Sequence, residues 1–171
     1  MPLPLRVREP VRGHDDTRQC PLKFDGIDGE SAHKDHKGEI QVLSWSWGLA
    51  SPGGASTGNT RRKAVPQEIR IVHRYDKASP MLAKQAVLRK HVPSAVLTAR
   101  KSGEGQKDFL KVTLKEVFIT SVQASEGGDG PTEEVAMSYG TIDFEYRPQD
   151  ATGRQGSAVQ FGWNIKAGKV S

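Results

Sequence analysis

The sequence LKFDGIDGES occupies residues 22–31, and IQVLSWSWG follows at residues 40–48. In the first stretch, apolar residues run into glycine and aspartate, which is typical of a strand that enters a tight turn. The second stretch is rich in the β-branched and aromatic residues that favour strands. We therefore expect one strand at 22–27 and another at 39–47, separated by a Gly/Asp turn.

The two tryptophans of the second strand lie two residues apart. Alternate residues of a strand point to the same face, so Trp45 and Trp47 should share a face with Leu43 as core or interface anchors. The opposite face is expected to carry Ile40, Val42, Ser44 and Ser46. The serines on that face are either an ordinary polar end of the strand or part of a surface that contacts a partner without adhering to it.

Alternation of apolar and polar residues predicts five further strands, most clearly at 157–166. Residues 135–146 change phase at Gly140, which predicts a bulge or bend, because glycine tolerates one. At 117–119 both faces become apolar, as expected where a strand passes between two sheets or turns a barrel corner. The five strands are expected at 68–75, 94–101, 108–119, 135–146 and 157–166. Seven strands punctuated by turns indicate a sandwich or a barrel.

One helix is expected among the strands. Ser79 is a suitable N-cap, and Pro80 fits the first helical position, where its missing N–H costs nothing. The residues that follow are good helix formers, and the pattern ends before Pro93. One face of this helix is expected to carry Leu82, Ala86 and Arg89.

The chain is expected to form one domain, residues 20–171, after an unstructured N-terminal extension, residues 1–19. The extension has three prolines, mixed charge and no periodicity, so it is unsuited to a packed core. Two Gly-rich segments, 49–66 and 125–132, are expected to be a long loop and a flexible turn. The first contains the basic run Arg61-Arg62-Lys63.

Composition excludes several classes of protein. The 171 residues carry a formal charge of +5 that is spread along the chain, so no nucleic-acid-binding surface is expected. Cys20 is the only cysteine, which excludes an intramolecular disulfide and a cysteine-cluster metal site. No run approaches the roughly 18 apolar residues of a membrane span, so no membrane insertion is expected. The N-terminus lacks the apolar run of a cleaved signal peptide, so export is expected to proceed without one.

Polar residues that could carry chemistry do not form a convincing site. His33 and His36 are three residues apart, but neighbouring lysines would repel a metal ion. His73 and His91 are expected to be packed or surface histidines, and Cys20 lies in a poor setting for a catalytic thiol. No nucleophile elbow or phosphate-binding loop is present in the sequence. We therefore expect that the protein is not an enzyme and holds neither a metal nor a cofactor.

Nine short motifs occur in a fixed order along the chain. They are FDGIDGES at 24–31, HKGEI at 36–40, LSWSWG at 43–48, YDKASP at 75–80, LTARK at 97–101, FLKVTLKEV at 109–117, PTE at 131–133, FEYRPQ at 144–149 and GWNIK at 162–166. Taken together, they make the chain similar to the Hcp (haemolysin-coregulated protein) family, the tube protein of type VI secretion. The resemblance covers about residues 22–168.

The resemblance implies a mainly β fold: a small β-barrel of two antiparallel sheets with one flanking α-helix, as in phage tail-tube proteins. It also implies a homo-hexamer whose rings stack into a tube, with a spike protein at the tip and a contractile sheath outside. Such a tube assembles in the bacterial cytoplasm and is then secreted to the extracellular space or a target cell. Its lumen can carry small effector proteins.

The same resemblance implies roles for particular residues. It places Ser46 toward the lumen as a cargo contact, and it directs the loop 49–66 toward the neighbouring ring. The expected ring-stacking residues of that loop are Arg61, Arg62 and Lys63, which could dock onto acids such as Glu126 or Asp129 of the next ring. The alternative is a monomeric β-barrel adaptor or chaperone for a secreted toxin, and ring formation distinguishes the two.

Overall fold

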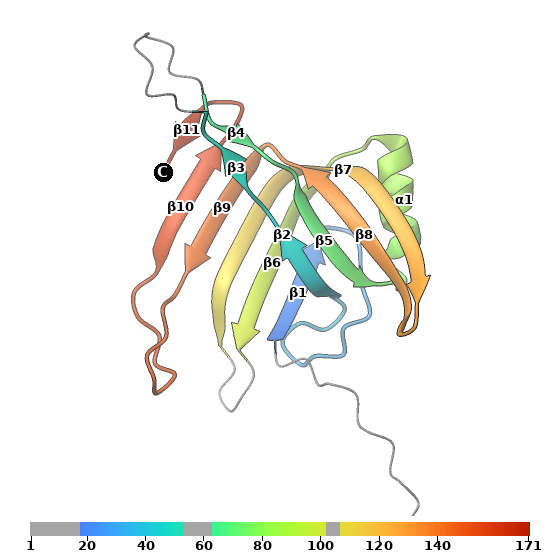
Figure 1. The fold of residues 1–171 in the computed structure, drawn as a ribbon, viewed down its shortest axis with the longest axis horizontal. Coiled ribbons are helices and arrows are strands. Elements are labelled where there is room, and N and C mark those ends of the chain that lie inside the picture. Colours follow the sequence, from blue (N-terminus) through green and yellow to red (C-terminus); the bar gives the residue numbers. More distant parts are fainter. Residues whose placement is uncertain (1–17, 53–62, 102–106) are drawn as a thin grey trace, which may run out of the picture.

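The computed structural model describes residues 18–52, 63–101 and 107–171 (Figure 1). Over these ranges the chain forms eleven strands and one helix. In chain order they are β1 (Arg18–Phe24), β2 (Ile40–Ser46), β3 (Leu49–Ala50), β4 (Val65–Pro66), β5 (Ile69–Arg74), α1 (Ser79–Leu88), β6 (Val92–Lys101), β7 (Asp108–Gly127), β8 (Gly130–Ser138), β9 (Thr141–Tyr146), β10 (Val159–Asn164) and β11 (Lys169–Val170).

The strands form a closed antiparallel barrel. The main sheet has the order β11-β10-β9-β7-β6-β1-β2-β5-β8, and it closes because β8 also pairs with β7. Six strands, from β7 through β6, β1, β2 and β5 to β8, therefore make the barrel, and β9, β10 and β11 extend the sheet from β7 (Figure 1). A second sheet contains only β3 and β4. The predicted fold class is confirmed: a small β-barrel of antiparallel sheets with one helix.

Closure depends on the length of β7, which has 20 residues and pairs with different strands at its two ends. Its first half pairs with β6 and β9, and its second half pairs with β8. Between the two halves, Glu116 adopts a positive φ of 52° and its side chain occupies the space beside Gly140. The bend predicted at Gly140 is confirmed, because this residue separates β8 from β9.

The barrel encloses one continuous apolar core, to which α1 contributes Leu82. Burial of each such side chain stabilises the fold by about 1.5–3 kcal/mol. The largest fully buried apolar side chains are Leu22, Ile40, Ile69, Ile71, Leu82, Leu97, Leu114, Met137 and Ile142. They come from seven different strands and the helix, so the core joins segments that are far apart in the sequence.

The helix begins differently from the prediction. Ala78, not Ser79, is the N-cap residue, and no side chain caps the helix there. The Ser79 hydroxyl instead accepts a hydrogen bond from the main-chain N–H of Asp76 at 3.2 Å, because Ser79 is buried and turned back toward the preceding turn. Arg89 is not part of the predicted helical face, since it adopts φ of 51° as the C-cap.

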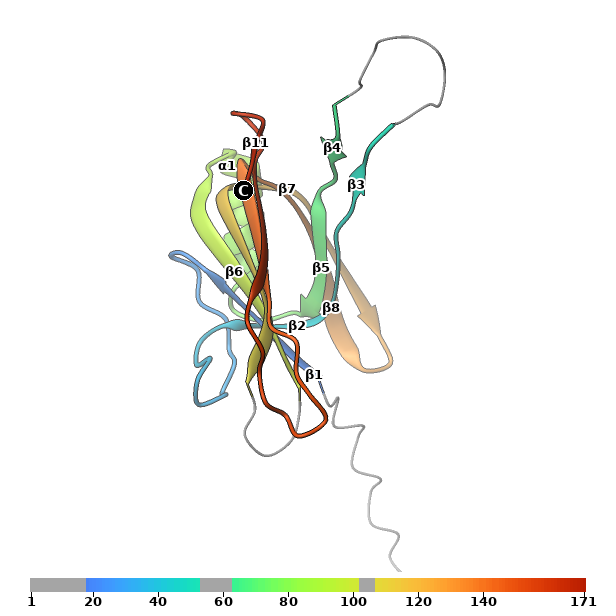
Figure 2. The same cartoon turned by 90° about the vertical axis from the view of Figure 1, so that its left-hand side faces the viewer.

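Three loop predictions also need correction. β1 begins at Arg18, inside the segment predicted to be unstructured, because residues 18 and 19 pair with the end of β6. The predicted loop 49–66 contains β3 and β4, which we call the arm. Most of the predicted turn 125–132 is strand, because β7 continues to Gly127 and β8 starts at Gly130. Figure 2 shows that the arm continues from β2 and β5 at the end of the barrel opposite to the β7–β8 turn.

Candidate functional site

The tryptophan strand β2 contains a β-bulge that changes which residues point inward. Val42 pairs with His73 and Ser44 pairs with Val72, so Leu43 is an extra residue on β2. Leu43 is therefore 39% exposed. The prediction that it shares a face with the two tryptophans is wrong. The inward-facing residues are Ile40, Val42, Trp45 and Trp47, and the exposed ones include Ser44 and Ser46.

Ser46 lies on a polar outer strip of the barrel. It is exposed and pairs with Arg70 of β5. The Arg70 guanidinium forms ion pairs with Glu68 at 3.3 Å and with Glu134 at 3.0 Å. Its positive charge is thus balanced by two carboxylates. Around Ser46 the surface offers a small hydroxyl for hydrogen bonding and no unbalanced arginine charge.

A buried tyrosine connects the barrel to the root of the arm. The Tyr139 hydroxyl accepts a hydrogen bond from the indole N–H of Trp47, and it donates one to the main-chain oxygen of Gln67 at 2.7 Å. Burial raises the pKa of Tyr139 above its ordinary value of 10.0, and the hydrogen bond from Trp47 opposes part of this shift. No role for Tyr139 was predicted from the sequence, although its place beside the phase change at Gly140 was an available signal.

Arg61 and Arg62, which were predicted to contact the next ring, lie outside the described residues. Lys63 is described and is exposed. Together with Lys166 it borders a groove of about 540 Å³ between the arm and the β10–β11 hairpin. The groove is largely apolar, and its apolar lining includes Leu49, Pro66, Phe161, Trp163, Ile165 and Val170.

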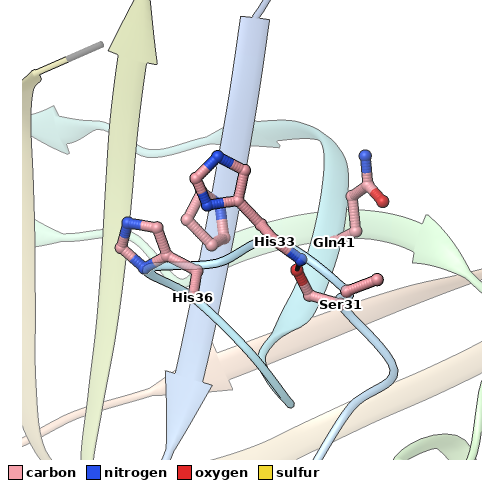
Figure 3. A pocket seen from close by; sticks show the side chains of 6 residues that line it. Ser31, His33, His36 and Gln41 are labelled. Carbon is pink, nitrogen blue, oxygen red and sulfur yellow. Dashed lines mark hydrogen bonds between the residues drawn. The ribbon is translucent and has the colours of Figure 1, made fainter. Parts of the chain in front are cut away.

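His33 and His36 line a small pocket of about 280 Å³ beside β1 (Figure 3). Their ring centroids are 5.8 Å apart. His36 Nδ1 lies 2.9 Å from a carboxylate oxygen of Glu39, and the main-chain N–H of Asp35 donates to His33 Nδ1 at 3.2 Å. Within the described part of the chain, no three histidine, cysteine or acidic side chains are arranged to hold a metal ion. The hydrogen bonds beside this pocket instead order the loop between β1 and β2.

Arg100 fastens this loop to the barrel. Its side chain is only 6% exposed and forms ion pairs with Asp35 at 3.2 Å and with Asp108 at 2.7 Å. Burial of the guanidinium acts to lower the pKa of Arg100, but the hydrogen bonds to Asp108 and Asp35 leave it raised. The hydrogen bond from Arg100 also lowers the pKa of Asp35.

A second polar pair is buried inside the barrel. His73 and Glu133 are cross-strand partners on β5 and β8, and the atoms His73 Nε2 and Glu133 Oε1 are 3.3 Å apart. Both residues are at most 1% exposed. His73 was expected to be either a packed or a surface histidine, and the structure shows that it is packed. Glu133 could have been placed inside from the sequence, because it has the same strand parity as Val135 and Met137.

Comparison with known proteins identifies relatives of this fold and sequence. The family model described as "Type VI secretion system effector, Hcp" matches residues 22–146. The protein hcp1 of Pseudomonas aeruginosa is 38% identical over 151 residues, which are 85% of this chain and 93% of that protein. The crystal structure of Hcp1 from Salmonella typhimurium has a TM-score of 0.76 and 31% identity, and the match covers 91% of this chain and 99% of that one.

A solved type six secretion system protein gives a TM-score of 0.83 at 29% identity, and the match covers 90% of this chain and 99% of that one. These matches extend over nearly the whole length of each relative. Among the residues that the structure describes, no helix is both long and apolar enough to cross a membrane.

Proposed function

This chain belongs to the Hcp family of type VI secretion proteins, and we propose that it forms hexameric rings that stack into the expelled inner tube of such a system. Each ring would close by a heterologous interface repeated around a sixfold axis. The spike protein at the tip and the contractile sheath outside are the proposed partners. The tube would assemble in the cytoplasm of the bacterium and leave the cell when the sheath contracts.

The observation that carries the stacking proposal is the placement of charged side chains at opposite ends of the barrel. Lys63 of the arm is exposed at one end, beside Lys166, whose own charge is paired with Glu116 at 3.0 Å. The β7–β8 turn, which carries the exposed acids Glu126 and Asp129, lies at the other end (Figures 1 and 2). Rings stacked head to tail would bring Lys63 of one ring toward Glu126 and Asp129 of the next. Arg61 and Arg62 would add to the same contact.

Ser46 is our proposed cargo contact in the lumen. Its hydroxyl is exposed beside Arg70, whose charge is balanced by Glu68 and Glu134. A surface of small and charge-balanced groups can hydrogen-bond a small effector protein without binding it so tightly that release fails. This property suits a conduit that must carry cargo and then give it up.

Size-exclusion chromatography with light scattering, followed by negative-stain imaging of the same peak, tests the ring proposal. We expect a species of six times 18.7 kDa that appears as rings. A monomer that persists at high protein concentration would overturn the proposal and support the adaptor or chaperone alternative.

Charge reversal tests the stacking contact. Lys63→Glu should leave the ring mass unchanged and shorten stacks, and adding Glu126→Lys should restore their length. Lys84→Glu is the matched control, because Lys84 is an exposed lysine of α1, which is part of neither the arm nor the β7–β8 turn. Equal stacking by the Lys63 and Lys84 variants would contradict the proposed role of Lys63.

Replacement of Ser46 by tryptophan tests the cargo contact. We expect rings of normal size that retain less co-expressed effector. Ser157→Trp is the control, because it places the same bulk on an exposed serine of the loop before β10. If the Ser46 variant loses its rings, or if both variants retain effector like the unaltered protein, Ser46 is not the lumen contact.

A further inference from the structure

We propose that Tyr139 is a positioning residue that sets the direction in which the arm leaves the barrel and thereby governs ring stacking. The direction of the arm is a property of the isolated chain. The effect on stacking rests on the proposed function, because it assumes that the arm contacts the next ring.

Both roots of the arm are tied to one hydroxyl group. Trp47 stands two residues before β3, and its indole N–H donates to Tyr139 Oη. Gln67 follows β4 directly, and its main-chain oxygen accepts the hydrogen of the same hydroxyl at 2.7 Å. The donor and the acceptor are 92 and 72 residues away from Tyr139 in the sequence. Rotation of the arm about its root would have to break at least one of these bonds.

The two roots also contact each other directly. The main-chain N–H of Gln67 donates to the oxygen of Gly48 at 2.9 Å. An added Cβ at Gly48 would lie 2.7 Å from the side-chain oxygen of Gln67, which shows how closely the two roots approach each other. Beyond this point the described pairing between β3 and β4 comprises two residues on each strand. The arm also borders the groove along the β10–β11 hairpin, so the contacts at the root act together with that packing to set its direction.

The group that holds the roots is itself well anchored. Tyr139 is 8% exposed and lies beside Gly140 at the barrel corner. The ring of Trp47 packs on Phe144 of β9 with centroids 4.8 Å apart. The Tyr139 hydroxyl therefore connects the arm to the rigid junction of β7, β8 and β9. The hydroxyl donates to Gln67 and accepts from Trp47 at the same time, so it joins the two roots at one point.

Hydrogen exchange of the full chain tests the positioning role. In Tyr139→Phe the ring stays and only the hydroxyl is removed, which leaves the Trp47 indole N–H and the Gln67 oxygen without this partner. We expect exchange of the Gln67 amide to accelerate about 5- to 100-fold. Exchange in β5 and β8 should change less than about twofold. Trp47→Phe, which removes the indole donor, should accelerate the same amide.

The control for this experiment is Tyr75→Phe, because Tyr75 is 45% exposed. Removal of the Tyr75 hydroxyl should leave hydrogen exchange of the Gln67 amide unchanged. Unchanged exchange of Gln67 in both Tyr139→Phe and Trp47→Phe would overturn the positioning role. Equal acceleration throughout the barrel would also overturn it, because the hydroxyl would then support the whole fold rather than the arm.

The consequence for stacking is measured separately by imaging. If the unaltered protein forms stacked rings, Tyr139→Phe should form rings of the same mass in shorter stacks, and Tyr75→Phe should stack normally. Normal stacking by Tyr139→Phe would overturn its role in stacking even if the arm is loosened. Failure of the unaltered protein to form rings would instead refute the proposed function, and the exchange experiment would still decide how the arm is held.

Discussion

Replacement of Gly29 by alanine tests how tightly the turn before β2 is packed. Gly29 is buried, and an added Cβ would lie 2.5 Å from the main-chain oxygen of Glu39 and 2.7 Å from Cα of Ile40. Non-bonded contacts of carbon normally lie at about 3.5–4.0 Å, so one main chain must move by about 1 Å. Ile40 is fully buried in the core, so the turn rather than β2 is expected to move.

The magnitude follows from what this movement disturbs. Of the three main-chain hydrogen bonds between the turn and the chain before β2, two involve Gly29 or its close contact Glu39: Gly29 N–H donates to the Gly38 oxygen at 2.8 Å, and Ser31 N–H donates to the Glu39 oxygen at 2.9 Å. Loss of each costs about 1 kcal/mol, and overpacking costs about 1–3 kcal/mol more. We expect the free energy of unfolding to fall by about 3–5 kcal/mol. For a chain of this size, that change lowers Tm by roughly 6–20 °C.

Thermal and denaturant unfolding of the purified variants, at one chain concentration, measure this effect. The concentration must be fixed because assembly raises the apparent stability. Gly127→Ala is the matched control, because an added Cβ there meets no described atom within 4 Å and its φ is not positive. It should change the free energy of unfolding by less than about 1 kcal/mol. If the two alanine variants unfold alike, the close approach at Gly29 does not constrain the fold as reasoned here.

Two further predictions concern charged groups. Glu133→Ala removes the buried partner of His73 and should lower the free energy of unfolding by about 2–4 kcal/mol. The control Glu134→Ala, on the exposed face of the same strand, should lower it by less than about 1 kcal/mol. Equal losses of the two variants in denaturant titrations would contradict the importance of burial. The hydrogen bond from Arg100 lowers the pKa of Asp35 below its ordinary value of 3.8, so its stabilising effect is present above that pH and is lost as the pH falls through the lowered pKa. Asp35→Asn should therefore flatten this part of the acid unfolding curve, and a curve that keeps its full slope would count against the pair.

Local periodicity predicted the longer strands because it reflects which side chains point inward, but it missed the two-residue strands β3, β4 and β11 and merged β8 with β9. Leu110, Val112 and Leu114 of β7 alternate with polar residues, and the structure places their side chains toward the apolar core. The phase change at Gly140 likewise predicted the bend between β8 and β9. The nine ordered motifs, taken together, were sufficient to indicate the family, which the comparisons with known proteins then showed.

Periodicity was misleading where one residue was inserted or where a polar group found a distant partner. The bulge at Leu43 reversed the expected face of part of β2, and its position depends on the pairing with β5. Ser79 looked like an N-cap, but its hydroxyl bonds back to Asp76. In both cases neighbouring residues in the sequence permit two arrangements, and contacts in the folded barrel select one.

Side-chain alternation and short motifs were enough to predict a strand-rich chain with one short helix and a fold of the Hcp family. How the barrel closes through both ends of β7, and how Tyr139 joins Trp47 to Gln67, became visible only in the folded molecule. The difference arises from separation along the chain. These contacts join residues dozens of positions apart, and their geometry is fixed only when the strands between them have paired in register.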